Sequence, residues 1–289
     1  MNWFTDIFRR SSTGERVPEP AIKPAQDKIK IYTKEELAVK MQEIRDSGWY
    51  VNPKPNNDGT PGDMLEALLG IPTNNLPIAD ASGWELKTQR VDTASLVSLS
   101  HKEPNPREER VVSRILLPLY GWQHDKAGTI YPENEMSFRM TMNGATFTDR
   151  GFKVRVNRAN SRIEIIFDSS MVNPRHKKWL ESVERRAGLG PLPITPYYNF
   201  TDLYLTIGRK FLNTLFVRFE TKNEDGKQYV HYTEAYFLEE ADIDKFLELI
   251  EAGKVKIECD ARTGHNHGTK IRMYFKDTPL VYKKVVRIM

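Results

Sequence analysis

The sequence predicts a mixed α/β (α+β) fold in which helices flank β-sheets. Apolar residues recur at helical spacing in two early segments, whereas several later segments alternate apolar and polar residues with the period of a strand. The chain has 289 residues, of which 39% are hydrophobic. This is enough to form one large core or two lobes that share a core.

Two helices are expected in the first part of the chain. Residues 33–46 carry apolar residues at helical spacing, and Thr33 followed by Glu36 matches a capping box. A loop rich in proline and asparagine comes next. It leads into a second, short helix that presents four apolar residues to the core and ends at Gly70.

Strands are expected after this helix. The segments LPIAD and GWELKTQR, at 76–80 and 83–90, are short and extended, and the residues between them suit a tight turn. The alternating segments at 135–147, 151–158 and 162–168 predict an antiparallel sheet. From residue 202 onward the pattern predicts a helix or strand, a strand, a helix and a final hairpin.

The composition says more about the cell compartment of the protein than about its function. The formal charge of +4 permits nucleic-acid binding without requiring it. No apolar run reaches the length of about 18 residues that suggests a membrane helix, and the N-terminus lacks the features of a secretory signal. A single cysteine, Cys259, fits a reducing compartment. We therefore expect a cytoplasmic protein without a membrane partner.

The main chemical candidate is the segment Asp80-Ala-Ser-Gly-Trp-Glu-Leu-Lys87. Side chains alternate along a strand, so Glu85 and Lys87 share one face while the apolar neighbours share the other. The preceding turn can bring Asp80 beside Glu85, and two carboxylates with the backbone carbonyl of Leu86 suit Mg²⁺, or Mn²⁺ in its place. Lys87 is expected to stabilise charge on a phosphate or to orient the attacking water.

Alone, the pattern D-x4-E-x-K is weak, because acids and lysines are common on strand edges. The longer string GDMLEALLGI...LPIADASGWELKT resembles the PD-(D/E)xK nucleases, and within them the MutH and MvaI/BcnI group. This resemblance implies four active-site residues: Glu66, Asp80, Glu85 and Lys87. Glu66 would complete a second metal position or orient water. The spacing between Asp80 and Glu85 matches MvaI-type enzymes better than MutH.

A dense polar cluster near the C-terminus is the candidate for DNA recognition. Arg262 can bond bidentately to guanine, and Asp260 can accept from cytosine. Four further residues can reach base edges or phosphates, although Lys270 alone is better explained as surface: His265, His267, Lys270 and Arg272. The MvaI/BcnI enzymes carry a similar acid-x-Arg pair followed by His-x-His-Gly, so the resemblance extends from about residue 35 to residue 282.

The resemblance implies a restriction-endonuclease-like mixed sheet and a second, DNA-recognition lobe that forms a clamp. We expect a flexible arm at 1–30, a catalytic lobe at 31–120 and a recognition lobe at 121–289 whose last segments pack back on the catalytic lobe. The expected function is that of a type II restriction endonuclease. It would act as a monomer on double-stranded DNA at short C:G-rich sites, one strand at a time, with a cognate methyltransferase as a genetic partner and not a bound subunit.

Other interpretations remain open at this point. A MutH-like mismatch-repair nickase and a catalytically inactive DNA-binding module are the two alternative functions. His265-Asn266-His267 does not match an HNH site, whose ligands are separated in the chain. Zinc bound by Cys259 with these histidines is disfavoured, because no second cysteine lies nearby. The remaining histidines stand alone and are expected to be structural or surface residues: His101, His124, His176 and His231.

Overall fold

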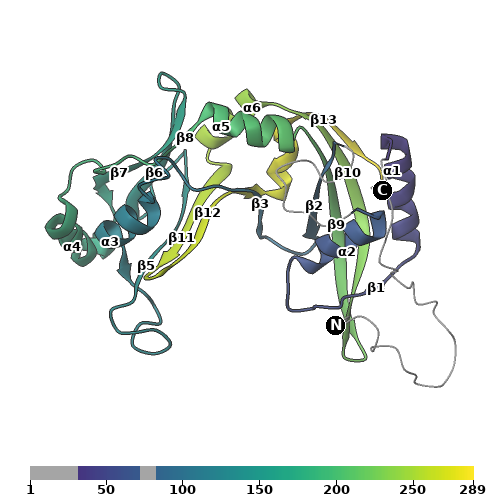
Figure 1. Ribbon diagram of the computed structural model, residues 1–289, viewed down its shortest axis with the longest axis horizontal. Coiled ribbons are helices and arrows are strands. Elements are labelled where there is room, and N and C mark those ends of the chain that lie inside the picture. Colours follow the sequence, from purple (N-terminus) through teal and green to yellow (C-terminus); the bar gives the residue numbers. More distant parts are fainter. Residues whose placement is uncertain (1–31, 72–82) are drawn as a thin grey trace.

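The computed structural model describes residues 32–71 and 83–289 and has the predicted mixed α+β fold (Figure 1). The helical segments are α1 (Lys34–Asp46), α2 (Thr60–Leu69), η1 (Val112–Leu116), α3 (Leu117–Tyr120), η2 (Pro174–His176), α4 (Lys177–Ala187), α5 (Phe200–Leu205), η3 (Thr206–Lys210), α6 (Ile243–Glu251) and η4 (Phe275–Val281). Among the described residues, none of these helices has the length and apolar character needed to cross a membrane.

In the described parts of the chain, the strands form three sheets. They are β1 (Tyr50–Val51), β2 (Glu85–Arg90), β3 (Leu96–His101), β4 (Trp122–Gln123), β5 (Met136–Asn143), β6 (Arg150–Asn157), β7 (Arg162–Val172), β8 (Tyr197–Asn199), β9 (Asn213–Glu224), β10 (Lys227–Ala241), β11 (Val255–Arg262), β12 (His265–Tyr274) and β13 (Tyr282–Arg287). The first sheet has the order β1-β10-β9-β2, with β13 also paired to β10. The second has the order β3-β12-β11-β5-β4, and the third has the order β6-β7-β8.

Local signals account for the two helices beside the first sheet. The capping box predicted at Thr33 and Glu36 is present at the start of α1. Helix α2 ends as predicted at Gly70, which adopts a left-handed conformation with φ of 68°. The buried residues of both helices join those of β2, β9 and β10 in one core cluster. The helices therefore cover the face of the sheet on which Trp84 and Leu86 lie.

The second and third sheets correct one expectation. Strand β5 pairs with β11 and β4, whereas β6 pairs with β7, so the three alternating segments do not form one antiparallel sheet. Alternation predicts which side chains share a face but not which strand becomes the neighbour. The final hairpin, β11–β12, is present. Strand β13 follows it and was not predicted.

The chain boundary expected near residue 120 does not separate the sheets. Strand β3 precedes this boundary but pairs with β12 of the second sheet. Strands β9 and β10 follow it but form the centre of the first sheet. Figure 1 shows the result, with β9 and β10 beside α1 and α2, and β5, β11 and β12 in the neighbouring part of the molecule. One core cluster joins the first sheet to the second, because it includes Phe216 of β9 as well as Phe138 of β5.

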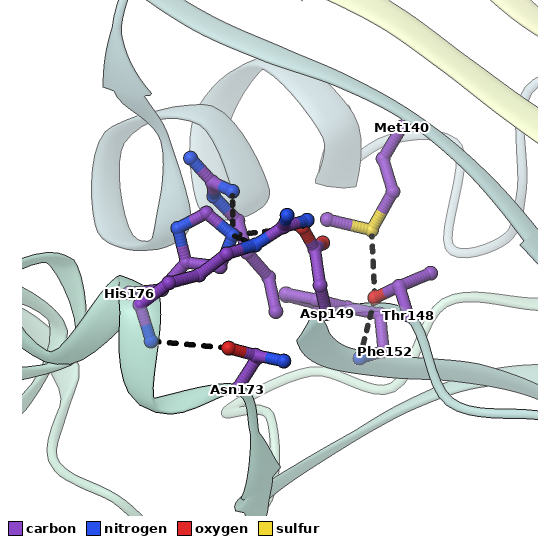
Figure 2. A network of polar contacts seen from close by, with 8 residues as sticks. Met140, Thr148, Asp149, Phe152, Asn173 and His176 are labelled. Atoms are coloured by element: carbon purple, nitrogen blue, oxygen red, sulfur yellow. Dashed lines mark hydrogen bonds and ion pairs between the residues drawn. The ribbon is translucent and has the colours of Figure 1, made fainter.

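A polar network ties the third sheet to the second, as Figure 2 shows. The Thr148 hydroxyl donates to Met140 Sδ at 3.5 Å and accepts from the Phe152 amide at 3.1 Å. Asp149 Oδ2 lies 2.7 Å from His176 Nε2 and is also paired with Arg175. Burial raises the pKa of Asp149, but the hydrogen bonds from His176 and Arg175 outweigh it, and the pKa is lowered. The network fixes the region around β5 and β6.

Candidate active site

Strand β2 holds the two acid-base residues of the candidate site. It runs parallel to β9, and Glu85 and Lys87 are opposite Thr214 and Phe216. Trp84 and Leu86 pack into the core on the other face, as the strand pattern predicted. This alternation places the carboxylate and the ammonium group side by side on one face of the sheet.

Glu85 and Lys87 form a close ion pair. Lys87 Nζ lies 2.6 Å from Glu85 Oε1, and the Glu85 side chain is 1% exposed whereas that of Lys87 is 24% exposed. The Lys87 ammonium group also lies 5.2 Å from the centroid of the Phe211 ring. Burial of a carboxylate costs free energy unless a charged or hydrogen-bonding partner compensates it. Separating Lys87 from Glu85 is therefore unfavourable, and the two groups keep a defined geometry.

Two hydroxyl groups near Glu85 were not predicted from the sequence. The hydroxyls of Thr214 and Tyr282 are 2.7 Å apart and buried. Burial raises the pKa of Tyr282 well above its ordinary value, and the negative charge of Glu85 raises it further. Tyr282 therefore stays protonated near Glu85. The only sequence signal is that Thr214 lies opposite Glu85 in β9, which requires knowing the strand pairing.

Glu66 lies on α2, which packs against β2. Gly62 of the same helix is so close to the strand that an added Cβ would lie 3.4 Å from Thr88 Oγ1. Glu66 is half-buried, and one of its carboxylate oxygens is buried. Asp80 lies outside the described residues. The structure thus places Glu66, Glu85 and Lys87 on adjacent elements, and the role of each remains a prediction.

The donor chemistry around β2 suits a hard divalent cation. Carboxylate oxygens are the protein ligands that Mg²⁺ prefers, and Glu85 supplies them from a sheltered position. Across residues 32–71 and 83–289 no group of three or more His, Cys, Asp or Glu is close enough to hold a metal. The predicted set depends on Asp80, which belongs to the segment outside these ranges.

Four of the predicted DNA-reading residues lie on one face of the β11–β12 hairpin: Asp260, Arg262, Lys270 and Arg272. Every second residue of β11 is buried, so Glu258, Asp260 and Arg262 share the more exposed face. Glu258 pairs with both Lys270 and Arg272 of β12, at 3.7 and 2.8 Å. The hairpin therefore presents acids and bases that neutralise one another.

Two partners of this face come from the loop and strand that precede it by more than a hundred residues. Arg139 Nε lies 3.7 Å from Asp260 Oδ1, and the Arg139 side chain is 72% exposed. Glu135 Oε1 lies 3.0 Å from Arg262 Nη1. Glu135, Arg139 and Glu258 were missed from the sequence. Only Glu258 had a usable signal, because it lies two residues before Asp260 on an alternating strand.

His265 and His267 lie at the exposed end of β12. Their rings are 4.1 Å apart, and His265 Nε2 is 3.2 Å from His267 Nδ1. Cys259, by contrast, is fully buried, and burial raises its pKa to about 12. Its side chain lies on the core face of β11, away from both histidines.

His101 lies near charged residues of both candidate regions, although the sequence suggested only a structural or surface role for it. Its pKa is lowered by partial burial and by the positive charges of Lys270, Arg272 and Lys87. Lys87 belongs to the candidate active site and the other two belong to the hairpin. The charged groups of the two sheets are therefore close enough to act on one histidine.

Comparison with known proteins gives the family of the chain. The sequence profile of the MvaI/BcnI restriction endonuclease family matches residues 38–282. The chain belongs to the MvaI/BcnI restriction endonuclease family. The resemblance inferred from the active-site and hairpin motifs is thereby confirmed, and the family consists of nucleases that act on DNA. A search of curated proteins found no match.

Two solved structures share the fold. The structure described as restriction endonuclease MvaI in complex with cognate DNA substrate has 21% sequence identity and a TM-score of 0.68, covering 88% of this chain and 97% of that chain. The structure of MvaI in the absence of DNA has 19% identity and a TM-score of 0.50, covering 90% of this chain and 100% of that chain. Restriction endonucleases of this family generally use divalent metal ions.

Proposed function

We propose that the chain is a type II restriction endonuclease that hydrolyses phosphodiester bonds of double-stranded DNA at a short C:G-rich site with Mg²⁺. The observation that carries this proposal is the Glu85–Lys87 ion pair on β2, with 2.6 Å between Lys87 Nζ and Glu85 Oε1. It places an ammonium donor beside a sheltered carboxylate in a chain of the MvaI/BcnI family.

The protein residues have distinct proposed roles. Asp80, Glu85 and the Leu86 carbonyl would hold Mg²⁺, and Glu66 would hold a second cation or orient water. When bound, Mg²⁺ lowers the pKa of a coordinated water and neutralises charge on the scissile phosphate. Lys87 donates a hydrogen bond to the attacking water or to a phosphate oxygen, where it stabilises the charge that develops in the transition state. Mn²⁺ is expected to substitute for Mg²⁺.

The β11–β12 hairpin is the proposed reading element. Arg262 donates to guanine O6 and N7, and Asp260 accepts from cytosine N4, which is the pairing expected at a C:G site. His265, His267, Lys270 and Arg272 contact further base edges or phosphates. We place the enzyme in the cytoplasm as a monomer. The catalytic lobe would consist of the first sheet with α1 and α2, and the recognition lobe of the second and third sheets. The arm expected at 1–30 lies outside the described residues. Its cognate methyltransferase is a separate protein.

Digestion of plasmid DNA tests the proposal. Purified protein with Mg²⁺ should yield discrete fragments whose sequenced ends define one site, and EDTA should abolish them. Nicked circles should precede linear DNA, because a monomer cuts one strand at a time. Product that stops at nicked circles would instead indicate a MutH-like nickase. Binding without any cleavage under Mg²⁺ or Mn²⁺ would indicate an inactive DNA-binding module.

A further inference from the structure

The loop between β4 and β5 is attached to the turn of the β11–β12 hairpin. The Met136 amide donates to Thr263 Oγ1 at 2.9 Å, and the Thr263 amide donates to the Met136 carbonyl at 3.0 Å. Figure 1 shows the loop that precedes β5 beside the same end of the hairpin. Residues 124–135, which no sequence motif singled out, thus lie next to the proposed reading face.

The last residue of this loop is a buried acid. Glu135 is 4% exposed and receives a hydrogen bond from Arg262 Nη1 at 3.0 Å. Its backbone is held as well, since its carbonyl accepts from the His124 amide at 2.8 Å and its amide donates to the Pro132 carbonyl at 3.0 Å. A buried carboxylate cannot leave its cation without a large desolvation cost. Glu135 therefore fixes one end of the Arg262 guanidinium group.

A second residue of the loop holds the face of the same group. The Arg262 guanidinium carbon lies 4.6 Å from the centroid of the Tyr131 ring, within the range of a cation–π contact. The Tyr131 ring is itself packed edge-on against His124, with 4.8 Å between ring centroids. Strand β4, which leads into the loop, is held in place as well, because the Arg150 guanidinium carbon lies 4.1 Å from the centroid of the Trp122 ring. The plane of the Arg262 guanidinium is thus defined by two contacts.

These contacts leave one edge of Arg262 open. Within the described part of the chain, Nη1 is the one guanidinium nitrogen of Arg262 with a hydrogen-bond acceptor, and the side chain is 31% exposed. Bidentate recognition of guanine needs two parallel N–H donors, which the edge formed by Nε and Nη2 provides. An arginine already held in one rotamer loses less conformational entropy when it binds.

We infer that Glu135 and Tyr131 are positioning residues for base recognition, which hold Arg262 so that its Nε–Nη2 edge meets a guanine in the major groove. This rests on the proposed function, in which Arg262 reads a C:G pair. Glu135 and Tyr131 do not touch DNA themselves. The specificity of the enzyme then depends on a loop more than a hundred residues from the reading hairpin in sequence.

The test compares site preference in matched variants. Full-length wild type, Glu135→Ala, Glu135→Gln and Tyr131→Leu are incubated with Mg²⁺ and a DNA library in which each position of the site is varied, and the cut ends are sequenced. Glu135→Ala should lower discrimination at the C:G position read by Arg262 by about 10- to 100-fold, the range expected for one charge-assisted hydrogen bond. Discrimination at the other positions should stay unchanged.

Two features separate positioning from a general structural role. Glu135→Gln keeps an acceptor for Arg262 and should restore part of the lost discrimination, whereas a purely structural defect would lower cleavage of all sites alike. Glu133→Ala, an exposed glutamate of the same loop, is the matched control and should cut as wild type does. If Glu135→Ala fails to fold, Glu135→Gln and Tyr131→Leu decide the question through the same site profile.

A double-mutant cycle completes the test. In the Arg262→Ala background, Glu135→Ala should cause no further loss of discrimination at that position, because the group it positions is absent. Additive losses, or an unchanged profile in Glu135→Ala and Tyr131→Leu from an active wild type, would overturn the inference and leave the proposed function intact. A wild type that cuts no DNA would instead contradict the proposed function, and the inference with it.

Discussion

The charged pair on β2 and the charged pairs at the β11–β12 hairpin differ in burial and in how far apart the partners lie in the sequence. Glu85 is 1% exposed and pairs with Lys87, two residues away in the same strand. At the hairpin, Asp260 of β11 is 19% exposed and its partner Arg139, on the neighbouring strand β5, is 72% exposed. The first pair is fixed by one strand and the core beneath it, whereas the second depends on how two strands, β5 and β11, come together.

This difference fits the role proposed for each region. A group that stabilises a transition state must keep its position, since catalysis depends on preorganised charges in a sheltered site. A face that reads DNA must present open edges of its charged groups to base edges and phosphates, so its charges are paired but remain accessible. The comparison predicts large losses of rate from changes on β2 and smaller changes of specificity on the hairpin.

Lys87→Ala should have the largest effect. Loss of the ammonium group would remove the donor proposed to stabilise the developing charge and the ion-pair partner of Glu85, so the cleavage rate should fall by about 10²–10³ or more. DNA binding measured without divalent cation should change little. The control is Lys283→Ala, a 58% exposed lysine on β13 of the same sheet, which should keep full activity. Comparable rates in Lys87→Ala and wild type would refute the assignment of the active site.

Arg262→Ala should have a smaller and different effect. A bidentate arginine–guanine pair contributes about 1 to 3 kcal/mol of discrimination, so preference for the correct base pair at one position should fall roughly 5- to 150-fold. Cleavage of the best site should persist. Competition between matched and single-substitution sites measures this directly, with Arg158→Ala, whose partner Glu251 is also exposed, as the control. An unaltered preference would remove Arg262 from the reading set.

The same contrast explains what could be predicted from the sequence. The shared strand face of Glu85 and Lys87, the capping box at Thr33 and the α2 terminus at Gly70 depend on neighbours a few residues away, and each was predicted. The contact between Glu135 and Arg262 joins residues 127 positions apart, and no local pattern encodes it. Alternation likewise identified β5 and β6 as strands but could not show that β5 pairs with β11.

The smallest expected effect is on the ionisation of a buried thiol on the core side of the hairpin. Cys259 lies between Glu258 and Asp260 on β11, but it faces the core and is fully buried. Burial raises its pKa from 9.0 to about 12, so the thiol stays protonated at pH 8, where an exposed cysteine is partly ionised. Because the folded state binds this proton more tightly than the unfolded state, the contribution to stability is lost as the pH rises from 9.0 toward 12.

Titration with Ellman's reagent at pH 8 checks this expectation. The native protein should react at a rate well below that of the same chain unfolded in guanidinium chloride, where one thiol per chain should react. Slow reaction would mean that the hairpin adjusts its exposed pairs while its core face stays closed, so recognition involves side chains and not opening of the sheet. Fast reaction of the native protein would show that β11 separates from its neighbours often. The contrast between a fixed β2 and an adjustable hairpin would then extend from the side chains to the backbone.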